Sequence, residues 1–183
     1  SEEERPRLTR TLDDAERAAR EGEVKLAKAV AEQARAEAQH FRDQIIESVA
    51  GLFFALEAGG RLVLWNRRVR EMLGDAVEVH RGATVIDFFE AADRGRVAAA
   101  IREGFAHGQA QVQATLVAAD GTCTPYLLVA RRLETSNGPL LAGTGIDITD
   151  RVRSEQELAR YRDGLEAQVR QRTAELEAVN ARL

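Results

Sequence analysis

The sequence predicts an α+β domain set between two long helices, with a five-stranded antiparallel sheet that carries helices on one face. Residues 1–47 and 151–183 are rich in Ala, Glu, Arg and Gln and have apolar residues at helical spacing. Between them, residues 48–150 hold nearly all the glycines and five of the six phenylalanines. Short β-rich runs separated by turn signals fill the same middle part. We therefore expect three parts: a helix, a compact domain and a second helix.

The first part, residues 1–47, predicts a single long amphipathic helix. From Leu12 to Ile45 its apolar residues recur in steps of three and four, with one step of seven. The stripe is narrow and largely alanine, so the helix would be marginal alone in water. It therefore predicts pairing with another helix.

The last part, residues 151–183, carries a heptad pattern. Apolar steps that average 3.5 residues predict a left-handed coiled coil. Arg162 and Arg172 stand at intervening core positions and would weaken the pairing. A weakened seam suits a signalling helix that changes register, and it is equally compatible with an imperfect coiled coil. The predicted seam consists of Leu158, Leu165, Val169, Leu176, Val179 and Leu183.

The middle part begins with a predicted hairpin. An apolar run at residues 52–56 is followed by a glycine turn at 58–60 and by a second run, RLVLW, at 61–65. Residues 66–73 then have helical spacing and stop at a glycine, which is a common helix end. Residues 84–89 predict a short helical turn.

One longer helix and a meander of three strands complete the middle part. The helix is expected to begin at Asp93 as its N-cap and to end at Gly108. Asp120-Gly121 and Asn137-Gly138 are typical of tight hairpin turns. The strands that they bound are expected at residues 111–118, 122–133 and 140–148.

Five motifs run through this part in order. They are LFFALEAGGRLVLWN at 52–66, Met72-Leu73-Gly74, DFFEAADRGRVAAAIREGFAHG at 87–108, the Asp120-Gly121 hairpin before Pro125-Tyr126, and GIDITD at 145–150. Together they resemble the PAS family of sensor domains over residues 45–153. The resemblance implies a sensory module of a bacterial-type signalling protein. The last helix resembles the linkers that lead into histidine kinases or diguanylate cyclases.

Asp147, Ile148, Thr149 and Asp150 join the last predicted strand to the last helix. Their polar side chains can satisfy free backbone donors at the helix N-terminus and favour its dipole. A distortion of the sheet would therefore reach the start of this helix. A ligand in the domain could bias two arrangements of a helix pair if it binds them with different affinities. By resemblance, we expect these four residues to relay the signal.

Large side chains between the helices and the sheet form both the predicted core and a candidate ligand pocket. A domain of about 100 residues needs many such side chains simply to fold, so core filling and ligand binding remain alternatives. The candidate residues are Phe54, Leu64, Trp65, Asn66, Met72, Phe88, Val97, Ile101, Phe105, Leu116, Tyr126, Leu128 and Ile146.

The resemblance raises two cofactors, and the sequence favours neither. Haem-binding relatives take an axial histidine from the long helix or the turn before it, and only His80 and His107 are candidates here. Relatives that hold flavin adenine dinucleotide use a Trp-Asn pair, which Trp65 and Asn66 match. Such a Trp more often closes the core, and such an Asn more often caps the following helix. The single cysteine, Cys123, lies at a strand start, away from the Asn-Cys motif of flavin photochemistry, and is expected to be a half-buried structural thiol.

The sequence also indicates several functions that we do not expect of this chain. A net charge of -4 gives no reason to expect nucleic acid or an anionic membrane as a partner. No apolar run approaches the roughly 20 residues that span a bilayer, so we expect a cytoplasmic chain without membrane insertion. His40 lacks the surroundings of a phosphoacceptor, and no other catalytic constellation is present, so the chain is not expected to be an enzyme. Ser1 in place of Met suggests a longer parent protein.

The sequence thus predicts a homodimer, paired through the terminal helices and the PAS core, with an output domain further along the same chain. One alternative is a purely structural dimerisation module without ligand. Another is a haem- or flavin-based redox or gas sensor. A small-molecule ligand remains a candidate partner, and its identity and the direction of regulation do not follow from the sequence.

Overall fold

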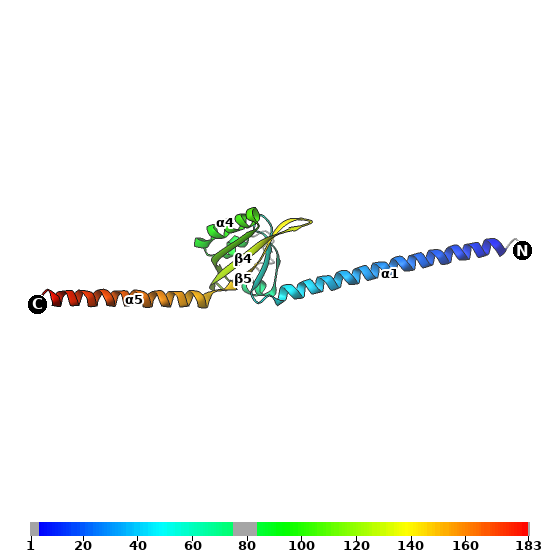
Figure 1. Cartoon of the computed structure of the whole chain (residues 1–183). Helices are drawn as coiled ribbons and strands as arrows, with labels where there is room; N and C mark the ends of the chain where they lie inside the picture. Colours follow the sequence, from blue (N-terminus) through cyan, green and yellow to red (C-terminus); the bar gives the residue numbers. More distant parts are fainter. Residues whose placement is uncertain (1–3, 75–83, 183) are drawn as a thin grey trace. The chain divides into compact units, whose positions relative to one another are not determined.

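The computed structural model describes residues 4–74 and 84–182 (Figure 1). Contacts divide the chain into two units, residues 1–48 and 49–183. The first unit is the helix α1 (Glu4–Ser48). Leu26, Val30 and Phe41 of its apolar stripe are exposed. Among the described residues, no helix combines the length and apolar character needed to cross a membrane.

The second unit holds all the strands, and it confirms the fold class that the sequence predicts. A single five-stranded antiparallel sheet carries helices on one face, and a long helix follows it. The elements are β1 (Leu52–Leu56), β2 (Leu62–Trp65), α2 (Arg67–Leu73), the 3₁₀ turn η1 (Val85–Phe88), α4 (Ala91–His107), β3 (Gln109–Val117), β4 (Cys123–Thr135), β5 (Gly138–Asp147) and α5 (Thr149–Asn180).

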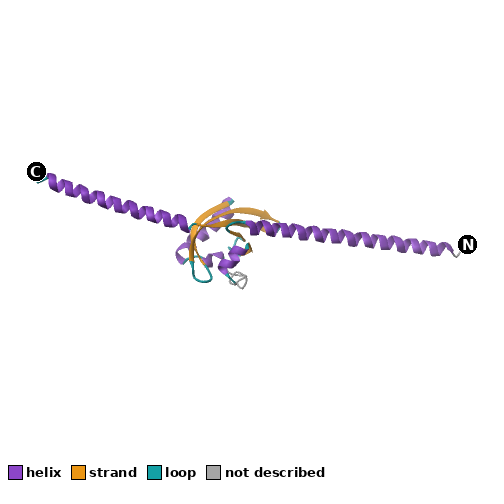
Figure 2. Cartoon of the chain, turned by 90° about the horizontal axis from the view of Figure 1, so that it is seen from below, coloured by secondary structure: helices purple, strands orange, loops and turns teal. Residues whose placement is uncertain are grey.

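The strands follow the order β2-β1-β5-β4-β3, so the first hairpin pairs with the last strand of the meander. Figure 2 shows the strands as one curved sheet. Both expected hairpin turns of the meander are present. Gly121 and Gly138 adopt φ angles of 83° and 111°, which disfavour residues with a side chain. These turns fix the register in which Tyr126 of β4 lies opposite Asp147 of β5.

Strand alternation divides the sheet into an inner face under the helices and an outer face. Leu52 and Leu56 of β1, Leu128 of β4 and Leu141 of β5 lie on the inner face and are buried. Helix α4 packs on this face against β3, β4 and β5 (Figure 1). The core therefore lies between α2, η1 and α4 on one side and the sheet on the other.

One buried amide holds the start of this core together. Asn66 is 0% exposed, and its Oδ1 accepts hydrogen bonds from Phe53 N (3.1 Å) and Val69 N (3.3 Å). Its Nδ2 donates to Gly51 O at 3.0 Å. Asn66 is thus the N-cap of α2 and at the same time a bridge to the beginning of β1. The helix and the strand are locked together by a single side chain.

Three local expectations need correction. Asp93 is not a helix N-cap, because α4 begins at Ala91, with Glu90 as its N-cap. Cys123 is exposed rather than half-buried, since its strand begins at the rim of the sheet. Strand β2 begins at Leu62, while Arg61 makes an isolated bridge to Thr84.

Replacing Asn66 with alanine should lower the free energy of unfolding by about 3 kcal/mol, because three hydrogen bonds of a fully buried side chain, of roughly 1 kcal/mol each, are lost. Asn66→Asp should be nearly as damaging, because a carboxylate cannot donate to Gly51 O. Urea unfolding measures both effects. Asn137→Ala, in an exposed turn, is the matched control and should change the free energy by less than about 0.5 kcal/mol. Equal effects at positions 66 and 137 would contradict this role.

Candidate functional site

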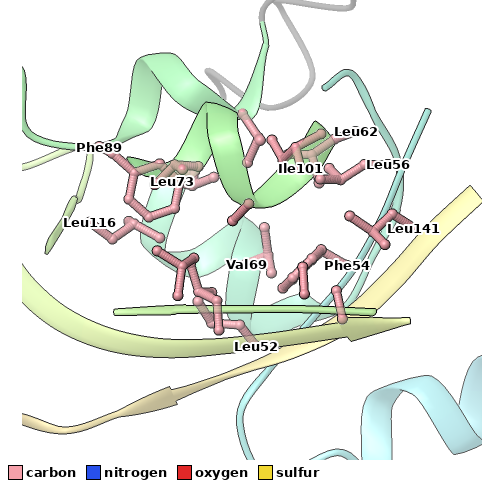
Figure 3. A pocket seen from close by; sticks show the side chains of 17 residues that line it. Leu52, Phe54, Leu56, Leu62, Val69, Leu73, Phe89, Ile101, Leu116 and Leu141 are labelled. Carbon is pink, nitrogen blue, oxygen red and sulfur yellow. The ribbon is translucent and has the colours of Figure 1, made fainter. Parts of the chain in front are cut away.

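A cavity of about 60 Å³ lies inside the domain, between the helices and the inner face of the sheet (Figure 3). All the described side chains that line it are apolar, and the close-up shows only carbon atoms in them. They come from every strand and from α2, η1 and α4. The lining residues are Leu52, Phe54, Leu56, Leu62, Val69, Leu73, Val85, Phe89, Val97, Ala100, Ile101, Ala110, Val112, Leu116, Leu128, Ala130 and Leu141.

Gly145 of β5, which lines the neighbouring groove, lies beside two leucines of the cavity wall. A Cβ added to Gly145 would lie 3.0 Å from Leu128 Cδ2 and 3.2 Å from Leu52 Cδ1. The absent side chain therefore leaves room that these two leucines occupy. Leu52 lines the cavity on one side and an open groove on the other. Movement of Leu52 would change the shape of both the cavity and the groove.

The open groove reaches the junction between β5 and α5. Tyr126 lies in it, and burial raises the pKa of its hydroxyl, with the Asp147 carboxylate adding to the rise and Arg68 opposing it. The groove is mixed in polarity, unlike the cavity. Its lining residues are Ala50, Gly51, Leu52, Arg68, Glu71, Met72, Ala118, Ala119, Asp120, Thr122, Thr124, Tyr126, Gly145, Ile146 and Asp147.

The junction itself is tied by short hydrogen bonds. The Asp147 carboxylate accepts from Thr149 N at 2.8 Å and from Thr149 Oγ1 at 2.6 Å. Ile148 is buried, and its backbone N donates to Pro125 O of β4 at 3.0 Å. Asp150 lies in the first turn of α5, where a negative charge favours the helix dipole. Sheet and helix are therefore joined without a flexible linker.

A family profile described as a PAS fold matches residues 46–153, more than half of the chain. The chain belongs to the PAS family. It carries a PAS sensor domain, and the match spans the whole sheet, the cavity and the first residues of α5.

Solved PAS structures share this fold. The PAS domain of an HTR-like protein from Haloarcula marismortui is 18% identical, with a TM-score of 0.55, over 64% of this chain and 97% of that one. A PAS domain from a two-component sensor histidine kinase is 12% identical, with a TM-score of 0.53, over 62% and 98%. A PAS domain from Colwellia psychrerythraea is 18% identical, with a TM-score of 0.51, over 62% and 98%. At these identities the likeness shows the fold alone. Among curated proteins there is no match.

The structure brings together only part of the pocket that the sequence predicts. Five of the predicted residues line the PAS cavity: Phe54, Val97, Ile101, Leu116 and Leu128. Trp65, Met72, Phe88, Phe105 and Tyr126 instead pack in or against the core around it, without lining it. Leu64 is half-buried and lines neither the cavity nor the groove.

Ile146 was placed on the wrong face of the sheet. Gly145 pairs with Leu52 and Leu128 on the inner face, so the next residue points to the outer face, and Ile146 is 56% exposed. Asn66 also does not line the cavity, because its side-chain oxygen and nitrogen are hydrogen-bonded to backbone groups of the fold.

Sequence reasoning missed most of the small and aliphatic residues of the cavity wall, such as Ala100, Ala110, Ala130 and Leu141. Strand alternation could have found several of them. Ala110 and Val112 share a face of β3 with Leu116, which the sequence did single out.

The cavity fits neither haem nor flavin adenine dinucleotide. Both are far larger than about 60 Å³, and no described histidine or polar side chain lines the space. His107 is exposed at the end of α4, and His80 lies outside the described residues. The Trp-Asn match to flavin-binding relatives has a structural explanation, since Asn66 is fully hydrogen-bonded. Trp65 packs against the core, and its Nε1 has no partner among the described residues.

The described residues of the predicted coiled-coil seam lie on α5, and their side chains are exposed on this single helix. Leu158, Leu165, Val169, Leu176 and Val179 are 44% to 68% exposed. Arg162 and Arg172 share the helix and form ion pairs with Glu166 and Glu175 one turn further on. Leu183 lies outside the described residues.

Asp93 clamps α4 to the sheet above the cavity. Its carboxylate accepts from Thr115 N of β3 at 2.7 Å and pairs with Arg96 of its own helix. The residue is buried, and these donors, the Thr115 backbone first and Arg96 second, hold the pKa of the carboxyl below its usual value. The aspartate that the sequence assigns to a cap thus fixes one wall of the cavity.

Asp93→Asn should lower the free energy of unfolding by about 1–2 kcal/mol at pH 7, because charge-assisted hydrogen bonds become neutral ones. The folded-state pKa lies below the unfolded-state value, so wild type loses this stabilisation as the pH falls from about 5 through the folded-state pKa. The gap between wild type and variant should therefore close in acid. Chemical unfolding at stepped pH measures it, with exposed Glu103→Gln on the same helix as the control. A gap that stays constant down to pH 2 would contradict the clamp.

Proposed function

We propose that this chain is a non-catalytic sensory module whose PAS core passes a ligand- or conformation-dependent signal into α5 and on to an output domain in the same protein. The observation that carries the proposal is the direct junction at Asp147-Ile148-Thr149-Asp150. Here the last strand of the sheet ends at Asp147 and the helix begins at Thr149. The family membership supports a sensory role, and the junction supports the direction in which the signal leaves.

A short physical path connects the cavity to the junction. A change of cavity shape displaces Leu52 or Leu128, and both pack where a Cβ of Gly145 would stand. Gly145 is two residues before Asp147 on the same strand. Displacement of this backbone alters the geometry in which Asp147 accepts hydrogen bonds from Thr149. The start of α5 is thereby the first element outside the core to respond.

The exposed seam of α5 supports homodimer formation. Most side chains of this apolar heptad stripe are more than half exposed. A second helix that covers the stripe would remove them from water and stabilise the pair. In a parallel pair, Arg162 faces its counterpart, and so does Arg172. Like charges at two core layers weaken the seam and allow the two helices to splay or shift at small cost. We propose that the output domain, of histidine kinase or diguanylate cyclase type, reads this shift.

The second candidate function is structural dimerisation without a ligand. The modest size of the cavity favours it, since about 60 Å³ is a small part of a well-filled core. Under this alternative, changes inside the cavity have no effect on α5. The two functions therefore differ in a measurable way.

A conservative change at Ile101 separates them. Ile101 lines the cavity beside Gly60, at the end of β1 that is remote from the junction. Ile101→Leu preserves volume and reshapes the cavity. In ¹⁵N spectra, a relay should show shifted amide resonances at residues 148–153, whereas Arg102→Lys on the exposed side of the same helix should leave them in place. Shifts confined to the core, with residues 148–153 unmoved, would rule out the relay and favour the structural role.

A further inference from the structure

The inner face of the sheet changes from apolar to polar along its length. On β4, Ala130 and Leu128 line the apolar cavity, whereas Tyr126 and Thr124, next on the same face, line the open groove. On β5, Asp147 lies directly opposite Tyr126, so the two side chains share this face as a cross-strand pair. The groove has a volume of about 830 Å³, which is within the range of pockets that bind small molecules.

Tyr126 brings an unsatisfied hydroxyl to this groove. The residue is 6% exposed, and its hydroxyl forms no hydrogen bond within the part of the chain that the structure describes. A buried tyrosine hydroxyl usually has a hydrogen-bond partner. The oxygen is not sealed inside the protein as Trp65 Nε1 is, so it opens into the groove that Tyr126 lines. A molecule in the groove could therefore supply the missing partner.

Two opposite charges flank this hydroxyl. Asp147 raises the pKa of Tyr126 and Arg68 lowers it, so both charges lie close enough to act on the ring oxygen. Asp147 accepts both of its hydrogen bonds from Thr149 at Oδ1, and its Oδ2 has no partner among the described residues. Arg68 is exposed and has no ion pair or hydrogen bond to any described residue. The groove thus presents an anion, a cation and a hydroxyl that can each accept a new partner.

The other charges of the groove disfavour two simpler classes of ligand. Glu71 pairs with Arg67 at 2.6 Å, and Asp120 accepts a backbone N–H at 2.9 Å. Together with Asp147 they put three carboxylates in the groove, so a ligand that is only an anion is repelled. A ligand that is only a cation meets the like charge of Arg68. A molecule that carries an ammonium and a carboxylate group satisfies both unpaired charges.

We propose that this groove binds a small zwitterion of the amino-acid class with an apolar side chain. The ligand ammonium donates to Asp147 Oδ2 and to the Tyr126 hydroxyl, and the ligand carboxylate pairs with Arg68. Leu52 and Met72, which also line the groove, offer apolar surface to the side chain. Binding is independent of the relay, but its role as a signal rests on the proposed function, because Asp147 belongs to the junction with α5.

L-Leucine, 3-methylbutylamine and 4-methylpentanoate are the matched probes. The amine lacks the carboxylate of leucine, the acid lacks its ammonium, and all three share the same hydrocarbon part. In isothermal titration calorimetry, leucine should bind at least about tenfold more tightly than either of the others, because only leucine pairs with both Asp147 and Arg68. No saturable binding of leucine, or equal affinity for leucine and one of the other two probes, would overturn the proposal.

Two variants locate the ligand. Arg68→Gln should weaken leucine binding by about tenfold or more and leave 3-methylbutylamine binding undiminished, because only the carboxylate contact is lost. Tyr126→Phe should weaken the binding of both by about fivefold, since both carry the ammonium. Arg70→Gln makes the same charge change on the same helix outside the groove, and it should bind leucine as wild type does. Undiminished leucine binding in both Arg68→Gln and Tyr126→Phe would contradict this site.

The outcome is separable from the test of the relay. No leucine binding, together with shifted amide resonances at residues 148–153 in Ile101→Leu, would contradict the site and leave the relay standing. Leucine binding, together with unshifted resonances in Ile101→Leu, would contradict the relay and leave the site standing.

Discussion

The domain depends on one fully buried amide. Asn66 satisfies two backbone donors and one acceptor, and in doing so it fixes the first turn of α2 against the start of β1. Val69 and Leu73 of that helix then line the cavity together with Leu52 and Leu56 of that strand. Asp93 does the same at the other side, where it holds α4 to β3. The described side chains that line the cavity beside these two buried polar residues are all hydrocarbon.

This arrangement separates two spaces of opposite character. The cavity is small and apolar, whereas the groove beside it is open and carries Arg68, Tyr126 and Asp147. Leu52 belongs to both walls. Because Gly145 has no side chain, the packing of Leu52 bears directly on the backbone that leads to α5. The cavity and the junction at which we propose that the signal leaves the domain are therefore neighbours in the fold.

The sequence predicted the strands of the sheet to within two residues at every boundary, because glycine turns mark the ends of the strands. It predicted the pocket less well. The face of Ile146 was misjudged because glycines at 143 and 145 hide the alternation of β5. Asp93 was assigned to a local cap because its true partner, Thr115, is 22 residues away and comes close only in the folded sheet. An aspartate near the start of a helix indicates a hydrogen-bond acceptor, but the sequence does not show which N–H group donates to it. Strand alternation places Ala110 and Ala130 on the inner face of the sheet, but which inner-face residues border an empty volume is decided only in the assembled core.

The most direct test of the coupling between cavity and helix is a distance between the two α5 helices of a dimer. A nitroxide on Ala167→Cys, at an outward position two residues beyond Leu165, reports it by pulsed electron spin resonance; Cys123→Ser removes the exposed native thiol. The distance is measured in the otherwise unchanged protein, in Ile101→Leu, which reshapes the cavity, and in Arg102→Lys, on the exposed side of the same helix. The account predicts a shifted distance distribution in Ile101→Leu and no shift in Arg102→Lys. An identical distribution in all three proteins would contradict the coupling.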